Sequence, residues 1–239
     1  MKGVILAAGR GTRLFPITKV VNKEILPVYN KPMIYYPIET LRESEVKEIL
    51  LVVGPGIGGQ FLNLLGSGKE LGVKIAYEVQ EEQHGVADAL AVAKDFADGG
   101  PIAVINADNI IEDIFPDVVR KFKEKNRGAV NAIVQVPDPE RSGVVELDGD
   151  RVVGIEEKPK KPKSNWVSVG FYLFDSRVFD VIKDLKPSSR GEYEISDVVK
   201  FYISEGTLEA VKLRGRWIDA GTFDSLLEAS LYAAKKSNK

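Results

Sequence analysis

The chain has 239 residues, 44% of them hydrophobic and 28% charged, which is an ordinary globular composition with ample material for a core. Its 33 basic and 35 acidic residues give a net charge of −2, which argues against a general nucleic-acid-binding protein, since phosphate backbones attract a basic excess. No cysteine is present, so disulfides and thiolate metal sites are excluded. No apolar stretch approaches the ~20 residues of a membrane span, and we expect a cytoplasmic protein that binds neither nucleic acid nor membrane.

The first half of the chain alternates short apolar runs with helical patterns. Strands are predicted at 4–7, 49–53, 73–79 and 102–105, and helix faces at 34–41 and 89–96. Such alternation is typical of βαβ units, and continuous apolar strands suit a sheet that is covered on both faces. We therefore expect an α/β fold with a Rossmann-like, mixed but mainly parallel sheet sandwiched by helices.

The second half has a different pattern. The apolar runs 144–147 and 152–155 flank Asp148 and Gly149, which is a strong signal for a hairpin. Further strands are predicted at 167–174, 208–213 and 217–218, and helices near 178–185, 195–203 and 223–231. No linker or repeat interrupts the chain. We expect one domain over 1–239, whose second half adds a smaller antiparallel portion over the strand ends.

A glycine-rich segment directly follows the first strand. Glycines such as Gly9 and Gly11 let backbone N–H groups approach a phosphate, and Arg13 adds a charged fork. The segment does not match the dinucleotide-binding fingerprint, because Leu14 occupies the place of its third glycine. It also lacks the lysine of a Walker phosphate-binding loop. A plain turn with a surface arginine fits the spacing equally well. Lys23 would be a second cation for a triphosphate, although a solvated lysine is the simpler interpretation.

Three carboxylates come at the ends of apolar runs. Asp108 follows the fourth strand, where ligands of parallel sheets bind, and could hold Mg²⁺ against phosphates; a helix N-cap is the competing interpretation, because 110–120 looks helical. Asp219 follows a late strand, and the two could share one metal, although spacing does not establish that they meet. Glu157 could bind sugar hydroxyls and Lys158 a monoester phosphate, whereas a charged edge strand is the common alternative.

In their order along the chain, these motifs resemble the sugar-1-phosphate nucleotidylyltransferase family, and within it the thymidylyltransferases that act on glucose 1-phosphate. Each piece is weak alone, but the ordered set spans nearly the whole chain and is highly specific. The resemblance is carried by 9–18, 23–28, 31–37, 79–80 with Gly85, 108–109, 143–144, 156–159, 190–197 and 219–222.

The resemblance implies that the chain transfers a nucleotidyl group from dTTP to glucose 1-phosphate with Mg²⁺, by direct attack of the sugar phosphate on the α-phosphorus. It implies a nucleotide-binding half of about 1–130 and a sugar-binding half of about 131–239. Its implied catalytic residues are Arg13, Lys23 and Asp108, and its implied metal ligands are Asp108 and Asp219. The implied nucleotide contacts are Ala8, Gly9, Gly11, Thr12, Arg13, Gln80 and Gly85, and the implied sugar-phosphate contacts are Asn109, Gly143, Glu157, Lys158, Val169 and Glu194.

Some residues depart from the pattern of the family. Asn106 and Ala107 precede Asp108 where leucine and glycine are usual, and His84 and Asp88 flank the glycine expected to read the base. The preference for dTTP over UTP therefore stays open. Since the chain ends soon after its last helical pattern, we expect the regulatory C-terminal helical region of longer relatives to be missing or reduced.

Other functions remain as alternatives. A UTP-dependent enzyme, or one for another sugar 1-phosphate, belongs to the same class. A noncatalytic nucleotide-sugar sensor could dispense with Arg13, Lys23, Asp108 or Asp219, yet all four are present. A scaffold protein gives no reason for the ordered motifs. Assembly into an oligomer of identical chains stays open.

Overall fold

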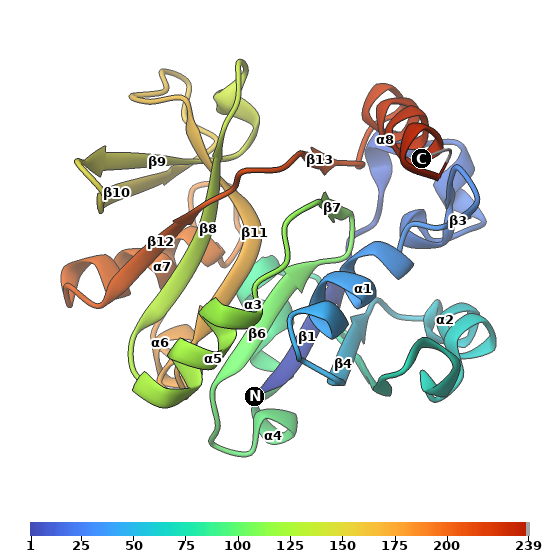
Figure 1. Ribbon diagram of the computed structural model, residues 1–239, viewed down its shortest axis with the longest axis horizontal. Coiled ribbons are helices and arrows are strands. Elements are labelled where there is room, and N and C mark those ends of the chain that lie inside the picture. The colour runs from blue at the N-terminus through green and yellow to red at the C-terminus, as the bar shows by residue number, and fades with distance from the viewer. Residues whose placement is uncertain (238–239) are drawn as a thin grey trace.

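One mixed sheet forms the centre of the molecule in the computed structural model, which describes residues 1–237 (Figure 1). Its parallel part runs in the order β5-β4-β1-β6, and β11 then pairs antiparallel with β6. The strands predicted in the first half are all confirmed. They correspond to β1 (Lys2–Ala7), β4 (Glu48–Val53), β5 (Lys74–Val79) and β6 (Ile102–Asn106), and the strand predicted at 167–174 corresponds to β11 (Trp166–Phe174).

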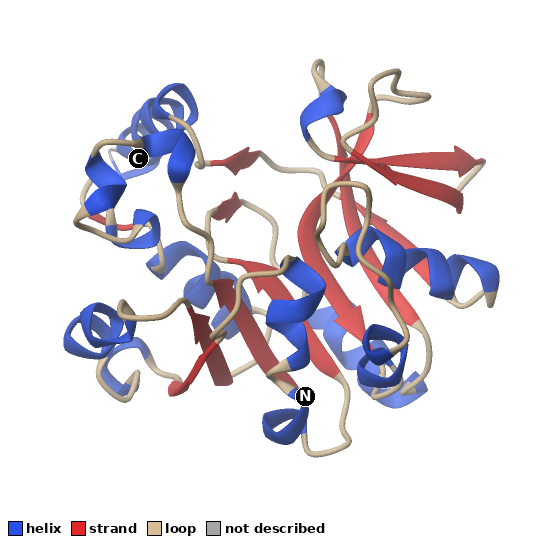
Figure 2. Cartoon of the chain, turned by 180° about the vertical axis from the view of Figure 1, so that it is seen from behind, coloured by secondary structure: helices blue, strands red, loops and turns tan. Residues whose placement is uncertain are grey.

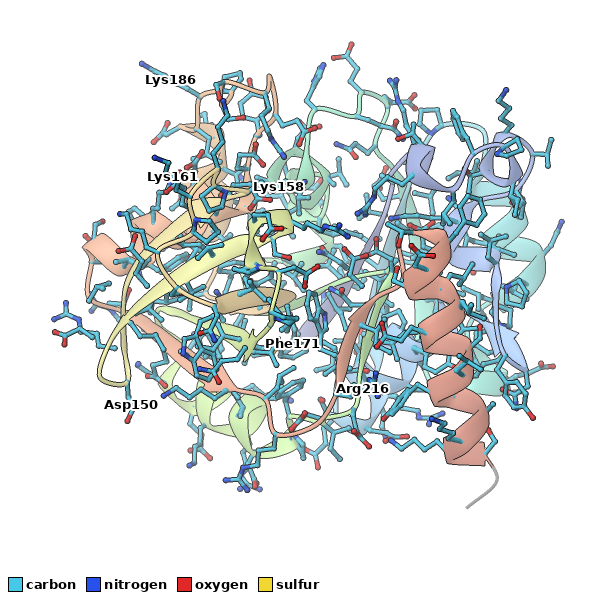
Figure 3. The ribbon with its side chains drawn as sticks, turned by 90° about the horizontal axis from the view of Figure 1, so that it is seen from above. Asp150, Lys158, Lys161, Phe171, Lys186 and Arg216 are labelled. Carbon is cyan, nitrogen blue, oxygen red and sulfur yellow. The ribbon has the colours of Figure 1, made fainter. Side chains whose placement is uncertain are left out.

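Beyond β11 the sheet divides. β8 (Ala129–Gln135) pairs with β11 and, in parallel, with β12 (Leu208–Lys212). The predicted hairpin is confirmed as β9 (Gly143–Asp148) and β10 (Arg151–Glu157). Its two-residue loop is Gly149 and Asp150, one residue later than expected, and Figure 3 shows Asp150 at the outer tip.

Helices cover both faces of this sheet (Figures 1 and 2). In β1, Val4 and Leu6 pack into one core and Ile5 and Ala7 into the other, because successive side chains of a strand point to opposite faces. The predicted sandwich is therefore confirmed. The first core includes α3 (Val86–Ala91), α4 (Lys94–Ala97), α6 (Val178–Lys183) and α7 (Ile195–Ser204), and the second includes α1 (Tyr35–Glu43), α2 (Gly58–Leu65) and α5 (Pro116–Lys125).

The last described elements of the chain pack against earlier segments. β13 (Trp217–Asp219) pairs antiparallel with β7 (Asn109–Ile111), and α8 (Phe223–Ser237) packs on β2 (Pro27–Val28), the partner of β3 (Lys31–Pro32). The helical pattern predicted over 110–120 is therefore wrong at its start, since α5 begins only at Pro116. Within residues 1–237, no helix is long and apolar enough to cross a membrane.

A buried carboxylate ties three segments of this fold together. Asp175, 4% exposed, accepts hydrogen bonds from the Gly128 backbone N–H at 2.7 Å and from the Tyr202 hydroxyl at 2.9 Å. It also accepts two from the Arg177 guanidinium, at 3.0 and 2.8 Å. Burial would raise the pKa of Asp175, but these donors together hold it below its ordinary value.

We expect Asp175→Asn to lower the free energy of unfolding by about 2 kcal/mol near neutral pH, because it leaves buried donors without a charged acceptor. A lowered folded-state pKa contributes stability that is present above the unfolded pKa of ~3.9 and is lost as the pH falls. The deficit should therefore shrink below about pH 4. Urea unfolding across pH 3–8 measures it, with exposed Asp184→Asn as control; a deficit that does not vary with pH would contradict this assignment.

Candidate active site

The loop after β1 folds back over Lys23. Gly11 has a φ of +61°, and a Cβ added there would lie 3.2 Å from both the Lys23 Cβ and the Thr18 Cγ2. The Thr18 hydroxyl donates to the Gly11 carbonyl at 2.7 Å and closes the loop. A short 3-10 turn over Thr12–Leu14 follows rather than an α-helix, so no helix dipole contributes here. Gly11 is therefore required both by its backbone conformation and by this close approach.

Lys23 and Asp108 form a close, largely buried ion pair at the site. The Lys23 Nζ lies 2.5 Å from the Asp108 Oδ2, and the two side chains are 12% and 14% exposed. Burial would raise the pKa of Asp108, but the charge and the hydrogen bond of Lys23 outweigh burial and lower it. Both groups therefore stay ionised in the folded protein.

Asp219 lies beside this pair. The β7–β13 register pairs Asp219 with Asn109, and the Ala220 N–H donates to the Asp108 carbonyl at 2.9 Å. Burial raises the pKa of Asp219, and the charge of Asp108 adds to that effect. The N-cap interpretation of Asp108 is wrong, because a strand and not a helix follows it. The structure thus brings together the two carboxylates predicted to bind metal.

Arg13 reaches the same place from the glycine-rich loop. Its Nη2 lies 3.8 Å from the Asp219 Oδ2, and half of its side chain is exposed. Gly221 allows this approach, because a Cβ there would lie 2.7 Å from the Asp219 Oδ1 and would also collide with the Arg13 guanidinium. Gly221 is thus needed for the contact between Arg13 and Asp219.

A cavity of about 580 Å³ opens beside the loop after β1. Its lining includes five of the predicted nucleotide contacts, namely Ala8, Gly9, Gly11, Thr12 and Gly85, together with Lys23 and Asp108. Arg10, Gln83 and Arg190 also line it; only Arg10 and Arg190 lie within motifs that the sequence singled out.

The predicted base-reading residue Gln80 does not line that cavity. Its side chain is buried, 3% exposed, and its amide nitrogen lies 2.5 Å from the Asp88 Oδ2 and 3.4 Å from the Gly85 carbonyl. Most of the Gln80 side chain is therefore buried beside Gly85, and its role in reading a base stays a prediction.

The wall of this cavity joins two distant loops. The Tyr193 N–H donates to the His84 carbonyl at 2.7 Å, and the Ala87 N–H donates to the Tyr193 carbonyl at 3.0 Å. Gly85, with a φ of +120°, lies so close that a Cβ would be 2.6 Å from the Tyr193 carbonyl oxygen. Only glycine fits this position, and the contact fixes the 188–193 loop against the nucleotide-side cavity.

A second cavity of about 220 Å³ shares Asp108, Asn106 and Val86 with the first. Glu194 does not line it, because this buried carboxylate accepts hydrogen bonds from the Ser188 hydroxyl at 2.8 Å and the Arg190 Nε at 3.0 Å. Its neighbours Ile195 and Ser196 do line the cavity. The other predicted sugar-phosphate contacts all line it: Asn109, Gly143, Glu157, Lys158 and Val169, with Arg13 and Asp219 beside them.

Asn109 acts as a clamp between strands at this cavity. Its amide nitrogen donates to the Val169 carbonyl at 2.5 Å, and its oxygen accepts from the Trp217 indole at 3.1 Å. The Val169 carbonyl lies at a β-bulge in β11, where the register to β8 shifts. The next residue, Gly170, has a φ of +73°. The Trp217 indole also helps to orient this amide.

Glu157 is the last residue of β10 and Lys158 follows it, and both line the second cavity. Burial raises the pKa of Glu157, and the charge of Lys158, whose Nζ lies 3.9 Å from the Glu157 Oε1, works against that rise. Asp150 and Lys158, both labelled in Figure 3, flank the two ends of β10. A cation and a carboxylate at one cavity mouth suit a ligand with both a phosphate and hydroxyls.

Hard oxygen donors at Asp108 and Asp219 suit Mg²⁺, which binds through one or two carboxylates and completes its shell with water and substrate phosphates. Among residues 1–237, no cluster of three or more His, Cys, Asp or Glu side chains could enclose a metal. A cation at this pair would therefore depend on oxygens of a substrate.

Comparisons with known proteins agree on one family. Residues 2–236 match the family described as Nucleotidyl transferase. The whole chain is 42% identical to the glucose-1-phosphate thymidylyltransferase of Neisseria meningitidis, covering 84% of that protein. Over 96% of its length it is 43% identical to the protein of that name from Mycolicibacterium smegmatis, covering 81% of it.

Solved structures give the same result. A Bacillus anthracis structure, described as a glucose-1-phosphate thymidylyltransferase in complex with sucrose, superposes with a TM-score of 0.93 at 44% identity, over 98% of this chain and 95% of that one. A UDP-glucose pyrophosphorylase complexed with UDP-glucose superposes with a TM-score of 0.85 at 25% identity, over 98% of both chains.

Glu24, next to Lys23, supplies a test of site electrostatics. Burial raises the pKa of this carboxyl to about 7, although the charge of Lys23, 3.5 Å away, lowers it. The unfolded chain loses this proton near pH ~4.3, whereas the folded chain keeps it until about pH 7. Since the folded state binds more protons in this window, the free energy of unfolding should fall as pH rises through it.

Glu24→Gln should abolish this fall. Relative to the parent chain, the variant should gain on the order of 1–3 kcal/mol of unfolding free energy between pH 4.5 and pH 8. Urea unfolding at the two pH values measures the change, with the exposed Glu124→Gln as the matched control. Parallel pH dependences of variant and parent would refute the raised pKa.

Proposed function

This chain belongs to the nucleotidyl transferase family, and we propose that it transfers a thymidylyl group from dTTP to glucose 1-phosphate, giving dTDP-glucose and pyrophosphate. The relatives named glucose-1-phosphate thymidylyltransferase, at 42% and 43% identity, support the choice of substrates. The observation that carries the proposal is the junction of the two cavities at Asp108, beside Lys23, Asp219 and Arg13.

The reaction needs no covalent enzyme intermediate. A phosphate monoester is already ionised near neutral pH, so an oxygen of glucose 1-phosphate attacks the α-phosphorus of dTTP, one P–O bond forms, another breaks, and pyrophosphate leaves. With dTTP in the cavity of about 580 Å³ and the sugar phosphate in that of about 220 Å³, the reacting phosphates meet at Asp108. Catalysis then consists mainly of positioning and charge stabilisation.

The side chains at the junction have distinct tasks in this proposal. Lys23, held in place by Asp108, neutralises charge on both reacting phosphates, and Arg13 stabilises the departing pyrophosphate. Lys158 holds the phosphate of the sugar substrate, and Glu157 accepts hydrogen bonds from its hydroxyls. Asp108 and Asp219 would hold Mg²⁺, which when bound supplies further positive charge against the phosphates.

A UTP-dependent reaction is the second candidate. The superposition with a UDP-glucose pyrophosphorylase favours it, and dTTP differs from UTP by a methyl group and a 2′-hydroxyl, differences worth only ~1–3 kcal/mol in a pocket. Release of pyrophosphate, measured for dTTP, UTP, CTP, GTP and ATP with glucose 1-phosphate and Mg²⁺, decides between them. If no triphosphate is consumed with any sugar phosphate, the protein is a nucleotide-sugar sensor instead.

Removing either proposed metal ligand should abolish turnover. We expect Asp108→Asn and Asp219→Asn each to reduce kcat by at least ~10²-fold, because the amides cannot balance the charge of the cation. Circular dichroism of both variants should stay close to that of the parent, but Asp108→Asn should lower the melting temperature, because it breaks the buried ion pair with Lys23. The exposed Asp184→Asn serves as control, and near-normal Mg²⁺-dependent rates in either variant would remove the metal assignment.

Arg13→Ala should act on the chemical step. Since Arg13 would stabilise charge that develops on the leaving pyrophosphate, kcat should fall by ~10²-fold or more with a smaller change in KM. Arg10→Ala, in the same loop, is the comparison for a general loss of positive charge. A rise in KM at constant kcat would mean that Arg13 binds ground and transition states equally.

A further inference from the structure

We propose that Asp88 is a positioning residue that fixes the orientation of the Gln80 amide and thereby makes the nucleotide site prefer a uracil or thymine base over cytosine. This inference rests on the proposed function, because it names the feature that selects the base at the same site. It concerns a residue that touches Gln80 rather than the nucleotide.

The hydrogen bond between these residues determines which way the amide points. The Gln80 amide nitrogen lies 2.5 Å from the Asp88 Oδ2, and a carboxylate can only accept. The NH₂ group must therefore face Asp88, and the same nitrogen lies 3.4 Å from the Gly85 carbonyl, another acceptor. Two acceptors on one side hold the NH₂ there and direct the carbonyl oxygen to the other side.

The carbonyl oxygen of Gln80 is left for a ligand. Among the hydrogen bonds of residues 1–237, none is donated to the Gln80 Oε1. It is not among the fully buried side-chain oxygens that lack a partner, so part of its surface is accessible although its residue is only 3% exposed. The nucleotide-side cavity is lined by residues close to Asp88 in the chain, namely Gly85, Val86 and Ala89.

Complementarity to a pyrimidine follows from this orientation. Uracil and thymine carry an N3–H donor on the edge that pairs with adenine, whereas cytosine carries an N3 acceptor at the same place. An oxygen held in a fixed direction accepts from the first and opposes the lone pair of the second. A buried polar group that cannot rotate to satisfy the wrong base discriminates far more strongly than a change in pocket size.

Asp88→Asn tests this directly. An asparagine has nearly the same shape but can donate as well as accept, so the Gln80 amide becomes free to rotate and present its NH₂ to cytosine. We expect the ratio of kcat/KM for UTP to that for CTP to fall by about tenfold or more. An inactive fraction of the preparation cancels in this ratio. Affinities for UTP and CTP, measured by calorimetry on the same variants, apply the same test without turnover.

Two further variants separate this role from general damage. Glu82→Gln makes the same chemical change at a 79% exposed carboxylate of the same loop and should leave the ratio unchanged. In a Gln80→Met background, Asp88→Asn should have no further effect on the ratio, because Asp88 acts only through Gln80.

An unchanged ratio in Asp88→Asn, or equal effects of Asp88→Asn with and without Gln80, would overturn the inference. Parent protein that binds UTP and CTP equally well would do the same. Failure of the proposed function has a different signature, since turnover would then be missing with every sugar phosphate while the affinity ratios still report on Asp88.

Discussion

The ion pair between Lys23 and Asp108 is the contact on which the site depends. Moving two charges out of water costs several kcal/mol per ion, and only a close, hydrogen-bonded pair offsets that cost. At 2.5 Å the two groups satisfy this condition, and each keeps the other ionised. Because Lys23 comes from the turn after the glycine-rich loop and Asp108 from the end of β6, their contact also joins the two elements whose loops shape both cavities.

The charges around this pair are not balanced. Asp219 lies beside Asp108, and its pKa is raised by burial and by the neighbouring carboxylate, although the half-exposed Arg13 at 3.8 Å, Lys23 and the Gly221 N–H act in the opposite direction. Two carboxylates that repel one another across a cavity junction gain from a divalent cation more than from a further lysine. On the proposed function, a cation held there would free Lys23 and Arg13 to bind phosphates. The same charged side chains would then stabilise both the empty site and the site with substrates bound.

Much of the fold could be predicted because continuous apolar runs are a local property. β1, β4 and β6 are each buried on both faces, and their sequences show it without reference to partners. β8 was missed because Asn131 interrupts its apolar run; this residue is fully buried, and its oxygen accepts from the Ser168 hydroxyl of β11 at 2.8 Å. β7 has only three residues and exists as a strand because β13 pairs with it.

The sequence by itself determined which residue types stand at the strand ends: the glycines and Arg13 after β1, and Asp108 after β6. The family resemblance added their roles, which stay predictions. Only the tertiary structure decided that Asp219 meets Asp108 across more than a hundred residues, that Glu194 is held by Arg190, and that Gln80 is held by Asp88. Strand ends follow from local burial, whereas contacts between distant side chains depend on how the segments pack, and no local pattern records that.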